Sequence, residues 1–154
     1  MQKIISTIET YAPVVLRITM AMVILWFGFQ QFLHTDVWTA YIPDSVTSAL
    51  GVSATVLVYF NALFEVAFGL LLVFGWHTRI VALLLALHLF DIMYVVGYGE
   101  IGVRDFGLAC ATFVVFMNGA DALSLHQRGN KNIQIPVSVP TPEPPREAPV
   151  RRLV

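Results

Sequence analysis

Four long apolar segments follow one another along this chain, and each contains at least one ionisable residue. The segments are built mainly from Leu, Val, Ile, Phe and Ala, yet they include Arg17, Glu65, the pair His88 and Asp91, and Asp105. A charge at bilayer depth costs about 3 kcal/mol or more, so such residues normally face a protein interior and belong to a working site. The sequence therefore predicts an all-α integral membrane four-helix bundle with a polar centre.

The composition supports a membrane protein and excludes several other classes. Hydrophobic residues make up 57% of the 154 residues, charged residues only 12%, and the mean hydropathy is +0.74. A soluble domain carries about 25% charged residues. A formal net charge of −1 without a basic stripe argues against nucleic-acid binding. Cys110 is the single cysteine, which excludes an intrachain disulfide, a Cys-x-x-Cys redox pair and a multi-cysteine metal site.

The apolar runs set the expected spans. Each is close to the ~20 residues that a membrane-spanning helix needs, and backbone groups in lipid need internal partners, so we expect helices. Their approximate bounds are 11–33, 51–74, 79–97 and 104–120. Only Lys3 precedes the first run and no small-residue cleavage site lies near Phe32, so we expect this span to be retained rather than removed as a signal peptide. Residues 1–125 are predicted to form one transmembrane domain.

The distribution of Lys and Arg predicts the orientation. With four spans, most basic residues fall on one side of the membrane and only Arg104 marks the other. The positive-inside rule then places both termini in the cytoplasm, in a multi-pass protein of the cell inner (plasma) membrane. The basic residues on the cytoplasmic side are Lys3, Arg79, Arg128 and Lys131.

Two segments lie outside the expected spans. Residues 34–50 contain Trp38, Tyr41 and Pro43, and the two aromatics suit the headgroup layer, so we expect a surface turn and short helix there. An exposed loop is the plainer alternative.

Residues 126–154 contain six of the eight prolines and too little apolar surface to fold, which predicts a disordered Pro-rich tail. A docking motif and a contact with anionic lipid are alternatives to a solvated tail.

Helical periodicity places the polar residues of each span on one face. Residues one turn apart share a face, because a turn contains about 3.6 residues. In all four spans this face mixes small and polar residues, which predicts that it points inward. The candidates for the polar interior are Arg17, Gln31, Asn61, Glu65, His88, Asp91, Arg104 and Asp105.

Arg17 and Glu65 are the first expected pair. They lie at similar distances from the cytoplasmic ends of the first and second spans, on helices that run in opposite directions. Two roles stay open for a buried pair of this kind: a structural clip that fixes helix register, or part of a binding site for an anionic or protonatable ligand.

His88 and Asp91 lie one turn apart near the middle of the third span. At this spacing the carboxylate can hold one ring nitrogen of the histidine and set its tautomer. A proton relay, a metal ligand, a quinone hydrogen-bond donor and a simple hydrogen bond across the helix interface all remain open. Arg104 lies at a depth from which it could reach Asp91, while Asp105 in a first helical turn also suits the helix dipole.

The histidines restrict the cofactors. Bis-histidine haem needs two histidines at one depth, but all except His88 fall in loops or at helix ends, so only a homodimer could supply the second ligand. A zinc or iron site needs three or four ligands, and only His88, Asp91 and Glu65 could converge. We therefore expect no intrinsic cofactor and no metal, with a quinone as the remaining candidate ligand. Asp121 and His126 at the exit of the last span are expected to be solvated.

Several stretches of the chain resemble the DoxX family of membrane proteins, and in their order and spacing they cover all four expected spans. These stretches are Leu16-Arg17, Trp26 to Phe32, Glu65 to Leu72, Gly75 to Arg79 and Val103 to Leu108. The resemblance implies a four-helix inner-membrane bundle. Some relatives are subunits of quinol oxidase or thiosulfate:quinone oxidoreductase assemblies, and others associate with redox-stress proteins. Many relatives carry a lysine where this chain has Gln31, and this departure weakens the case for an anionic substrate there.

The residues and the resemblance together predict a subunit or accessory of a quinone-linked membrane oxidoreductase system. It would be at most a non-catalytic or quinone-interacting subunit, and no catalytic residue is assigned. The alternative is a small proton-coupled transporter that acts as a homodimer with Glu65 as the coupled carboxylate, and a purely structural membrane partner is the third interpretation. The expected partners are the lipid bilayer, other membrane redox subunits or a second copy of the chain.

Overall fold

The computed structural model describes residues 2–125, and within that range it contains helices and no strands. The all-α prediction is therefore confirmed. Four helices are long and two are short. In chain order they are α1 (Gln2–Leu33), α2 (Thr35–Thr39), α3 (Asp44–Leu50), α4 (Ala54–Phe74), α5 (Thr78–Val96) and α6 (Glu100–Asn118).

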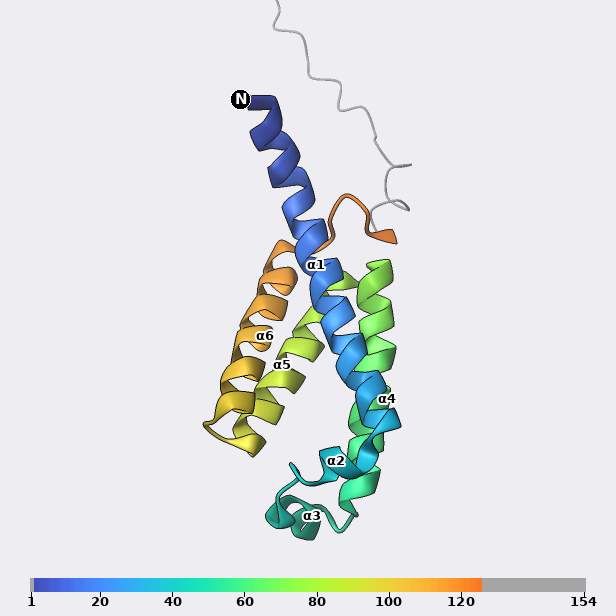
Figure 1. Ribbon diagram of the computed structural model, residues 1–154. Coiled ribbons are helices and arrows are strands. Elements are labelled where there is room, and N and C mark those ends of the chain that lie inside the picture. The colour runs from blue at the N-terminus through green and yellow to red at the C-terminus, as the bar shows by residue number, and fades with distance from the viewer. Residues whose placement is uncertain (1, 126–154) are drawn as a thin grey trace, which may run out of the picture.

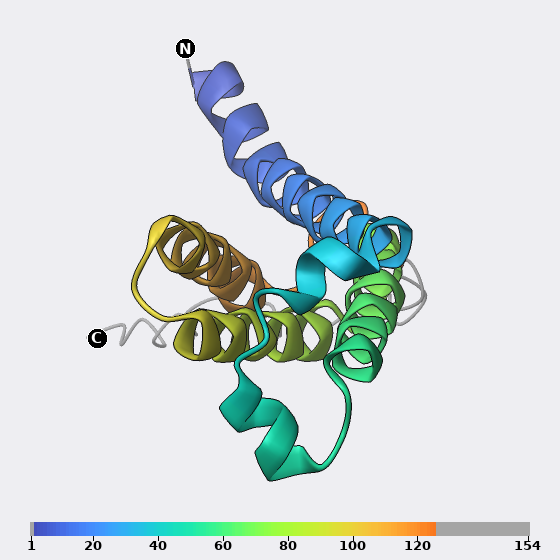
Figure 2. The same cartoon turned by 60° about the horizontal axis from the view of Figure 1, so that its bottom comes forward.

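The long helices form two antiparallel pairs, α1 with α4 and α5 with α6, and contacts between the pairs are fewer (Figure 1). One end of the bundle, which we call the terminal end, holds the α4–α5 turn and the end of α6. The N-terminal part of α1 projects beyond it. The opposite end, the α2–α3 end, also holds the α5–α6 turn. Figure 2 shows α2 extending from the end of α1 across the region between the two pairs.

Local sequence explains the boundaries of α4. Ser53 caps its start, because the serine hydroxyl accepts a hydrogen bond from the N–H of Val56 at 3.4 Å. Gly75 ends it in the left-handed region with φ of 66°, where glycine is strongly preferred. A Cβ added at Gly75 would also lie 2.7 Å from Cα of Ser124, so this turn needs glycine for space as well. The tight turn makes α4 and α5 antiparallel neighbours.

Glycines allow α1 and α4 to approach closely. A Cβ added at Gly28 of α1 would lie 2.8 Å from Cγ2 of Val66, and one added at Gly69 of α4 would lie 3.0 Å from Leu25. Small residues at helix crossings are typical of membrane bundles. The buried apolar cluster that joins the helices consists of Met20, Ala21, Ile24, Leu72, Val81, Ala82, Leu85, Leu89, Ala109 and Val115.

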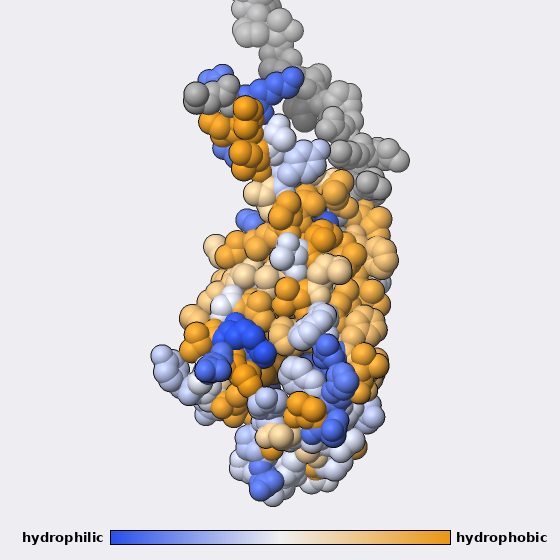
Figure 3. Space-filling model, viewed as in Figure 1, coloured by the Kyte–Doolittle hydropathy of each residue, from blue (hydrophilic) through white to orange (hydrophobic). Residues whose placement is uncertain are grey.

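Large apolar side chains cover the outside of the bundle, as the broad orange surface in Figure 3 shows. A contiguous apolar surface of this extent suits lipid rather than water. Helices α1, α4 and α5 are long and apolar enough to cross a membrane. Helix α6 is the least apolar of the four, since it begins with Glu100 and carries Arg104 and Asp105 in its next turn. Examples that are more than half exposed are Trp26, Phe60, Leu63, Ile80 and Leu87.

The helix boundaries differ from the expected spans in several places. Helix α1 begins at Gln2 rather than near residue 11, because no glycine or proline interrupts residues 2–12 and Pro13 is accommodated inside the helix. Helix α6 begins at Glu100, inside the expected 97–103 link. The expected surface link folds as the two short helices α2 and α3. The expected Pro-rich tail, residues 126–154, lies outside the described residues.

Candidate functional site

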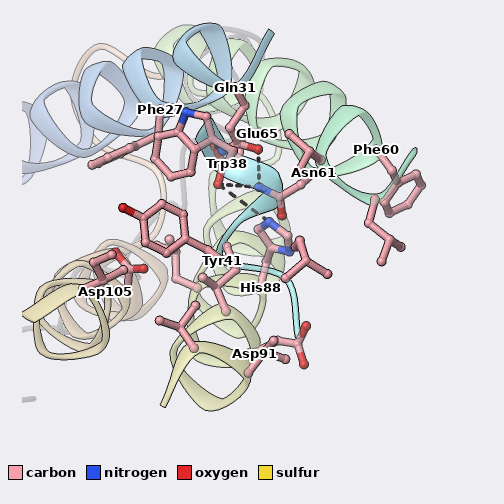
Figure 4. Close-up of a pocket in the computed structure, with 18 of the residues that line it drawn as sticks. Phe27, Gln31, Trp38, Tyr41, Phe60, Asn61, Glu65, His88, Asp91 and Asp105 are labelled. Carbon is pink, nitrogen blue, oxygen red and sulfur yellow. Dashed lines mark hydrogen bonds and ion pairs between the residues drawn. The ribbon is translucent and has the colours of Figure 1, made fainter. Parts of the chain in front are cut away.

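A pocket of about 260 Å³ lies between the two helix pairs at the α2–α3 end, and every helix of the described range contributes lining residues (Figure 4). Its wall is mostly apolar and aromatic. A mostly apolar cavity with a few convergent polar groups is the usual form of a small-molecule site. The polar and ionisable lining residues on the long helices are Gln31, Asn61, Glu65, His88, Asp91, Arg104 and Asp105.

Glu65 is the centre of a hydrogen-bonded group in this pocket. The Gln31 side-chain amide donates to Oε2 of Glu65 at 2.7 Å. The Asn61 amide donates to Oε1 of Glu65 at 3.1 Å and to the side-chain oxygen Oε1 of Gln31 at 2.7 Å. Gly28 lies beside Glu65, so the absence of a side chain at Gly28 lets α1 bring Gln31 this close. The two amides therefore fix the orientation of a buried carboxyl group.

His88 faces this group from α5. Its Nε2 lies 3.8 Å from Oε1 of Glu65, which is beyond hydrogen-bond distance, and has no hydrogen-bond partner within the described residues. The imidazole packs on Phe64, with ring centroids 4.5 Å apart. Asp91 is exposed and points away from His88 in Figure 4, and no hydrogen bond joins the two in the part of the chain described. His88 thus presents a ring nitrogen to the pocket beside Glu65.

Arg104 and Asp105 form the second charged group of the pocket. Nε of Arg104 donates to Oδ1 of Asp105 at 2.7 Å. The guanidinium also lies over the Phe27 ring, 4.4 Å from its centroid. The Arg104 side chain is 37% exposed and that of Asp105 is 4% exposed, so the pair reaches from the pocket to its edge. The expected pairing of Arg104 with Asp91 is wrong, because Arg104 pairs with Asp105 instead.

Aromatic rings form much of the remaining wall. Phe27 packs edge-to-face on Trp38, with centroids 5.9 Å apart, and Trp38 lies 6.0 Å from Tyr41. The sequence assigned Trp38 and Tyr41 to the headgroup layer and did not single out Phe27. Phe27 precedes Gln31 by one turn, and this spacing could have identified it. The position of Trp38 and Tyr41 depends on how the 34–50 link folds back onto the bundle. Local sequence patterns do not predict this path.

Arg17 lies at the terminal end, away from the pocket. Its Nε donates to Oδ2 of Asp121 at 2.7 Å, and its NH2 nitrogen donates to Oδ1 at 3.2 Å. Its NH1 nitrogen donates to the carbonyl oxygens of Leu72 at 2.6 Å and Val73 at 2.5 Å. The expected Arg17–Glu65 pair is therefore wrong. Arg17, which is 1% exposed, instead fastens the segment after α6 to the last turn of α4.

Asp121 is correspondingly buried, and the expectation that it is solvated is wrong. Burial by itself raises the pKa of the Asp121 carboxyl, but hydrogen bonds from Arg17, the N–H of Leu123 and the Ser124 hydroxyl, together with the charge of Arg17, hold it below its ordinary value. The sequence missed this partner because Asp121 follows the last apolar run and looks like an ordinary loop residue. His126 lies outside the described residues.

The structure thus brings seven of the eight candidates around one pocket and places Arg17 elsewhere. Residues 2–125 contain no group of three His, Cys, Asp or Glu side chains that could hold a metal ion. Glu65 and His88 approach each other, but Asp91 does not join them.

Three apolar helices of spanning length, an apolar outer surface and ionisable side chains turned inward define a helical membrane protein. A family model, DoxX, matches residues 12–98, which is more than half of the chain. The chain therefore belongs to the DoxX family. The matched region covers most of α1 and continues through α5, and it ends before α6 begins. Comparison with curated proteins and with solved structures gave no match.

Proposed function

We propose that this chain binds the headgroup of a lipid-soluble quinone or quinol in the pocket at the α2–α3 end. It would act as a non-catalytic subunit or accessory of a quinone-linked oxidoreductase system in the plasma membrane. The observation that carries the proposal is the pairing of an aromatic wall with Glu65 and His88 inside an apolar bundle. A quinone headgroup is a flat ring with polar oxygens, and it reaches proteins through the hydrocarbon phase.

The hydrogen-bond capacity of the pocket supports such a ligand. Gln31 and Asn61 are used to hold Glu65, whereas Nε2 of His88 has no partner among the described residues. His88 can donate to a quinone carbonyl through an Nε2–H or accept from a quinol hydroxyl, depending on its tautomer. Glu65 is next to that position and can accept a hydroxyl proton. The flat rings of Phe27 and Trp38 offer surfaces for stacking.

The charges around the pocket disfavour an anionic ligand. Glu65, Asp91 and Asp105 supply carboxyl groups, and Arg104 is already paired with Asp105. An anionic ligand would meet an excess of acidic groups and a guanidinium whose charge is already compensated. Quinones and quinols carry no net charge and avoid this repulsion.

The proposed topology has four crossings with both termini in the cytoplasm. Helix α6 supplies the fourth crossing, since it packs antiparallel along the length of the apolar helix α5. The described N-terminal part of α1, the α4–α5 turn with Arg79, and the end of α6 then share the cytoplasmic side. The lipid bilayer, other redox subunits and a second copy are the proposed partners.

Quinone binding is tested with the protein in nanodiscs. Only Trp38 of the three tryptophans lines the pocket, so the variant Trp26→Phe/Trp76→Phe leaves one reporter there. Titration with a short-chain quinone should quench Trp38 fluorescence to saturation. His88→Leu should weaken binding several-fold to about tenfold, the equivalent of one lost hydrogen bond. Gln30→Leu is the matched control, because it also replaces a polar side chain by leucine. Gln30 is next to Gln31 in the sequence but does not line this pocket. Unsaturable quenching, or equal affinities for all variants, would contradict the proposal.

A proton-coupled transporter is the second candidate, favoured by the position of Glu65. A buried carboxyl group lies in a pocket at one end of the bundle, while the Arg17–Asp121 pair fastens the other end. Substrate-dependent proton flux into liposomes that Glu65→Gln abolishes would support transport. Quinone binding without such flux would support the redox role. Loss of another membrane subunit on deletion, with neither activity, would leave the structural role.

A further inference from the structure

Helix α1 is longer than the bundle that it belongs to. Its 32 residues extend about 48 Å at 1.5 Å per residue, against about 30 Å for the hydrocarbon core of a bilayer. Residues 2–12 project beyond the terminal end, and all of them are exposed (Figure 1). We propose that this segment is an amphipathic helix that lies on the phospholipid surface, with its apolar face at the boundary between headgroups and acyl chains.

The segment has one apolar face and one polar face. At about 100° per residue, its apolar side chains fall within an arc of about 120° and its polar side chains occupy the opposite side. Ile4 and Ile8, at the centre of the apolar arc, are 67% and 60% exposed. Figure 3 shows apolar and hydrophilic patches side by side on this projection. The apolar residues are Ile4, Ile5, Ile8, Tyr11 and Ala12, and the polar ones are Gln2, Lys3, Ser6, Thr7, Glu9 and Thr10.

The apolar face continues the lipid-facing surface of the same helix. Steps of three, four and seven residues keep side chains on one helical face. Beyond Ile4, Ile8 and Tyr11, these steps lead along α1 to further exposed apolar residues. They are Val15, Met22, Trp26, Phe29 and Leu33. The projection therefore carries the surface that contacts lipid in the spanning part, and the nearest apolar phase available to it is the same bilayer.

The width of the apolar face favours lipid over a second copy. A coiled-coil seam is narrow, whereas Ile5 and Ala12 widen this face to the broad arc of a surface-lying helix. On the polar face, the hydroxyls of Ser6 and Thr7 donate to the carbonyl of Lys3, and that of Thr10 donates to the carbonyl of Ser6. These side chains need no protein partner and can face headgroups and water.

Pro13 lies where the projection meets the bundle. Proline has no N–H, so the hydrogen bond to the carbonyl of Glu9 cannot form, and helices bend readily at such positions. The segment can therefore turn at Pro13 from the direction of the spanning helix into the plane of the membrane. The bend would bring the apolar face of residues 2–12 onto the leaflet.

Site-directed spin labels test this arrangement in the full-length chain. In a Cys110→Ser background, Ile8→Cys and Ser6→Cys place a nitroxide on opposite faces of the segment, and Met22→Cys provides a reference in the lipid-facing surface. Each variant is placed as one molecule per nanodisc of mixed zwitterionic and anionic phospholipids. Accessibility to oxygen, which partitions into lipid, is compared with accessibility to a water-soluble nickel complex.

The oxygen-to-nickel accessibility ratio should be at least several-fold higher at Ile8→Cys than at Ser6→Cys, and close to that at Met22→Cys. Equal, low ratios on both faces would show a helix standing in water and would overturn the proposal. Shielding of Ile8→Cys that is present only in nanodiscs with two molecules would show that a second copy covers the face. That outcome would overturn it as well.

Discussion

Breaking the buried Arg17–Asp121 pair should destabilise the bundle strongly, although neither residue touches the pocket. Asp121→Asn keeps the shape of the side chain but leaves a guanidinium that is 1% exposed without its counter-charge. Removing one partner of a buried pair costs about 3–5 kcal/mol. The carbonyls of Leu72 and Val73 still accept from Arg17, so we expect the lower part of that range.

Arg17→Met should cost about 3–5 kcal/mol of unfolding free energy, because it leaves Asp121 unpaired and removes both hydrogen bonds to the end of α4. The double variant Arg17→Met/Asp121→Asn should cost less than the sum of the single variants by about 2 kcal/mol, since the second change removes a charge that the first left alone. Arg104→Met is the comparison variant, because Arg104 is also paired with an aspartate but is 37% exposed. Its partner Asp105 is 4% exposed and loses its counter-charge in this variant. The cost should still be smaller than for Arg17→Met, because the Arg104 guanidinium is partly solvated and makes no hydrogen bond to the backbone among the described residues.

The assay is equilibrium unfolding in mixed micelles of dodecylmaltoside and dodecylsulfate, followed by circular dichroism, for the single and double variants. Additivity within about 0.5 kcal/mol would show that Arg17 and Asp121 do not interact and would refute the reasoning. An Arg104→Met effect as large as that of Arg17→Met would equally refute it, because the burial of the Arg17 guanidinium and its two hydrogen bonds to α4 would then make no difference.

Two further predictions concern pH and helix packing. The pKa of Asp121 is lower in the folded state than in the unfolded state, so its stabilising contribution is present above about pH 3.9, the ordinary value for aspartate, and is lost as the pH falls through the folded pKa. The difference in unfolding free energy between the wild type and Asp121→Asn should therefore be constant near neutral pH and shrink on acidification below about pH 4. A difference that grows below that pH would contradict this prediction. Gly28→Ala should destabilise the protein by about 1–3 kcal/mol and weaken quinone binding, since its Cβ would press on Val66 and move Gln31 from Glu65. Gly107→Ala, where a Cβ meets nothing within 4 Å, should do neither in the same unfolding and fluorescence measurements.

The polar faces of individual helices could be predicted from the sequence, because helical spacing alone determines which residues share a face. Asn61 and Glu65 stand one turn apart and do hydrogen-bond. The register between helices could not be predicted in this way. Gly28, not Arg17, lies beside Glu65, and Arg17 lies beside the end of α4 instead.

The error in the depth of Arg17 has a physical cause. We placed the start of the first span at the first apolar residues, near Tyr11, and counted inward from there. The apolar stripe of α1 continues past the bundle to Ile4, so hydropathy does not mark the level at which the bundle ends. A membrane-surface helix and a spanning helix both present apolar side chains to lipid. Only the contacts between helices distinguish the part of α1 that belongs to the bundle from the part that projects beyond it.

The two polar groups of the bundle show how a structural ion pair differs from a candidate binding site. Arg17 makes four hydrogen bonds within the described residues, two to Asp121 and two to backbone carbonyls, so it has little capacity left for a ligand. Glu65 is also buried and His88 is partly buried, but Nε2 of His88 has no hydrogen-bond partner among the described residues and a cavity adjoins both side chains. Because an unsatisfied buried polar atom costs free energy, a ligand that supplies the missing partner gains from it. Unused hydrogen-bonding capacity beside an open volume, rather than charge alone, is therefore the reason to propose the ligand site at the α2–α3 end.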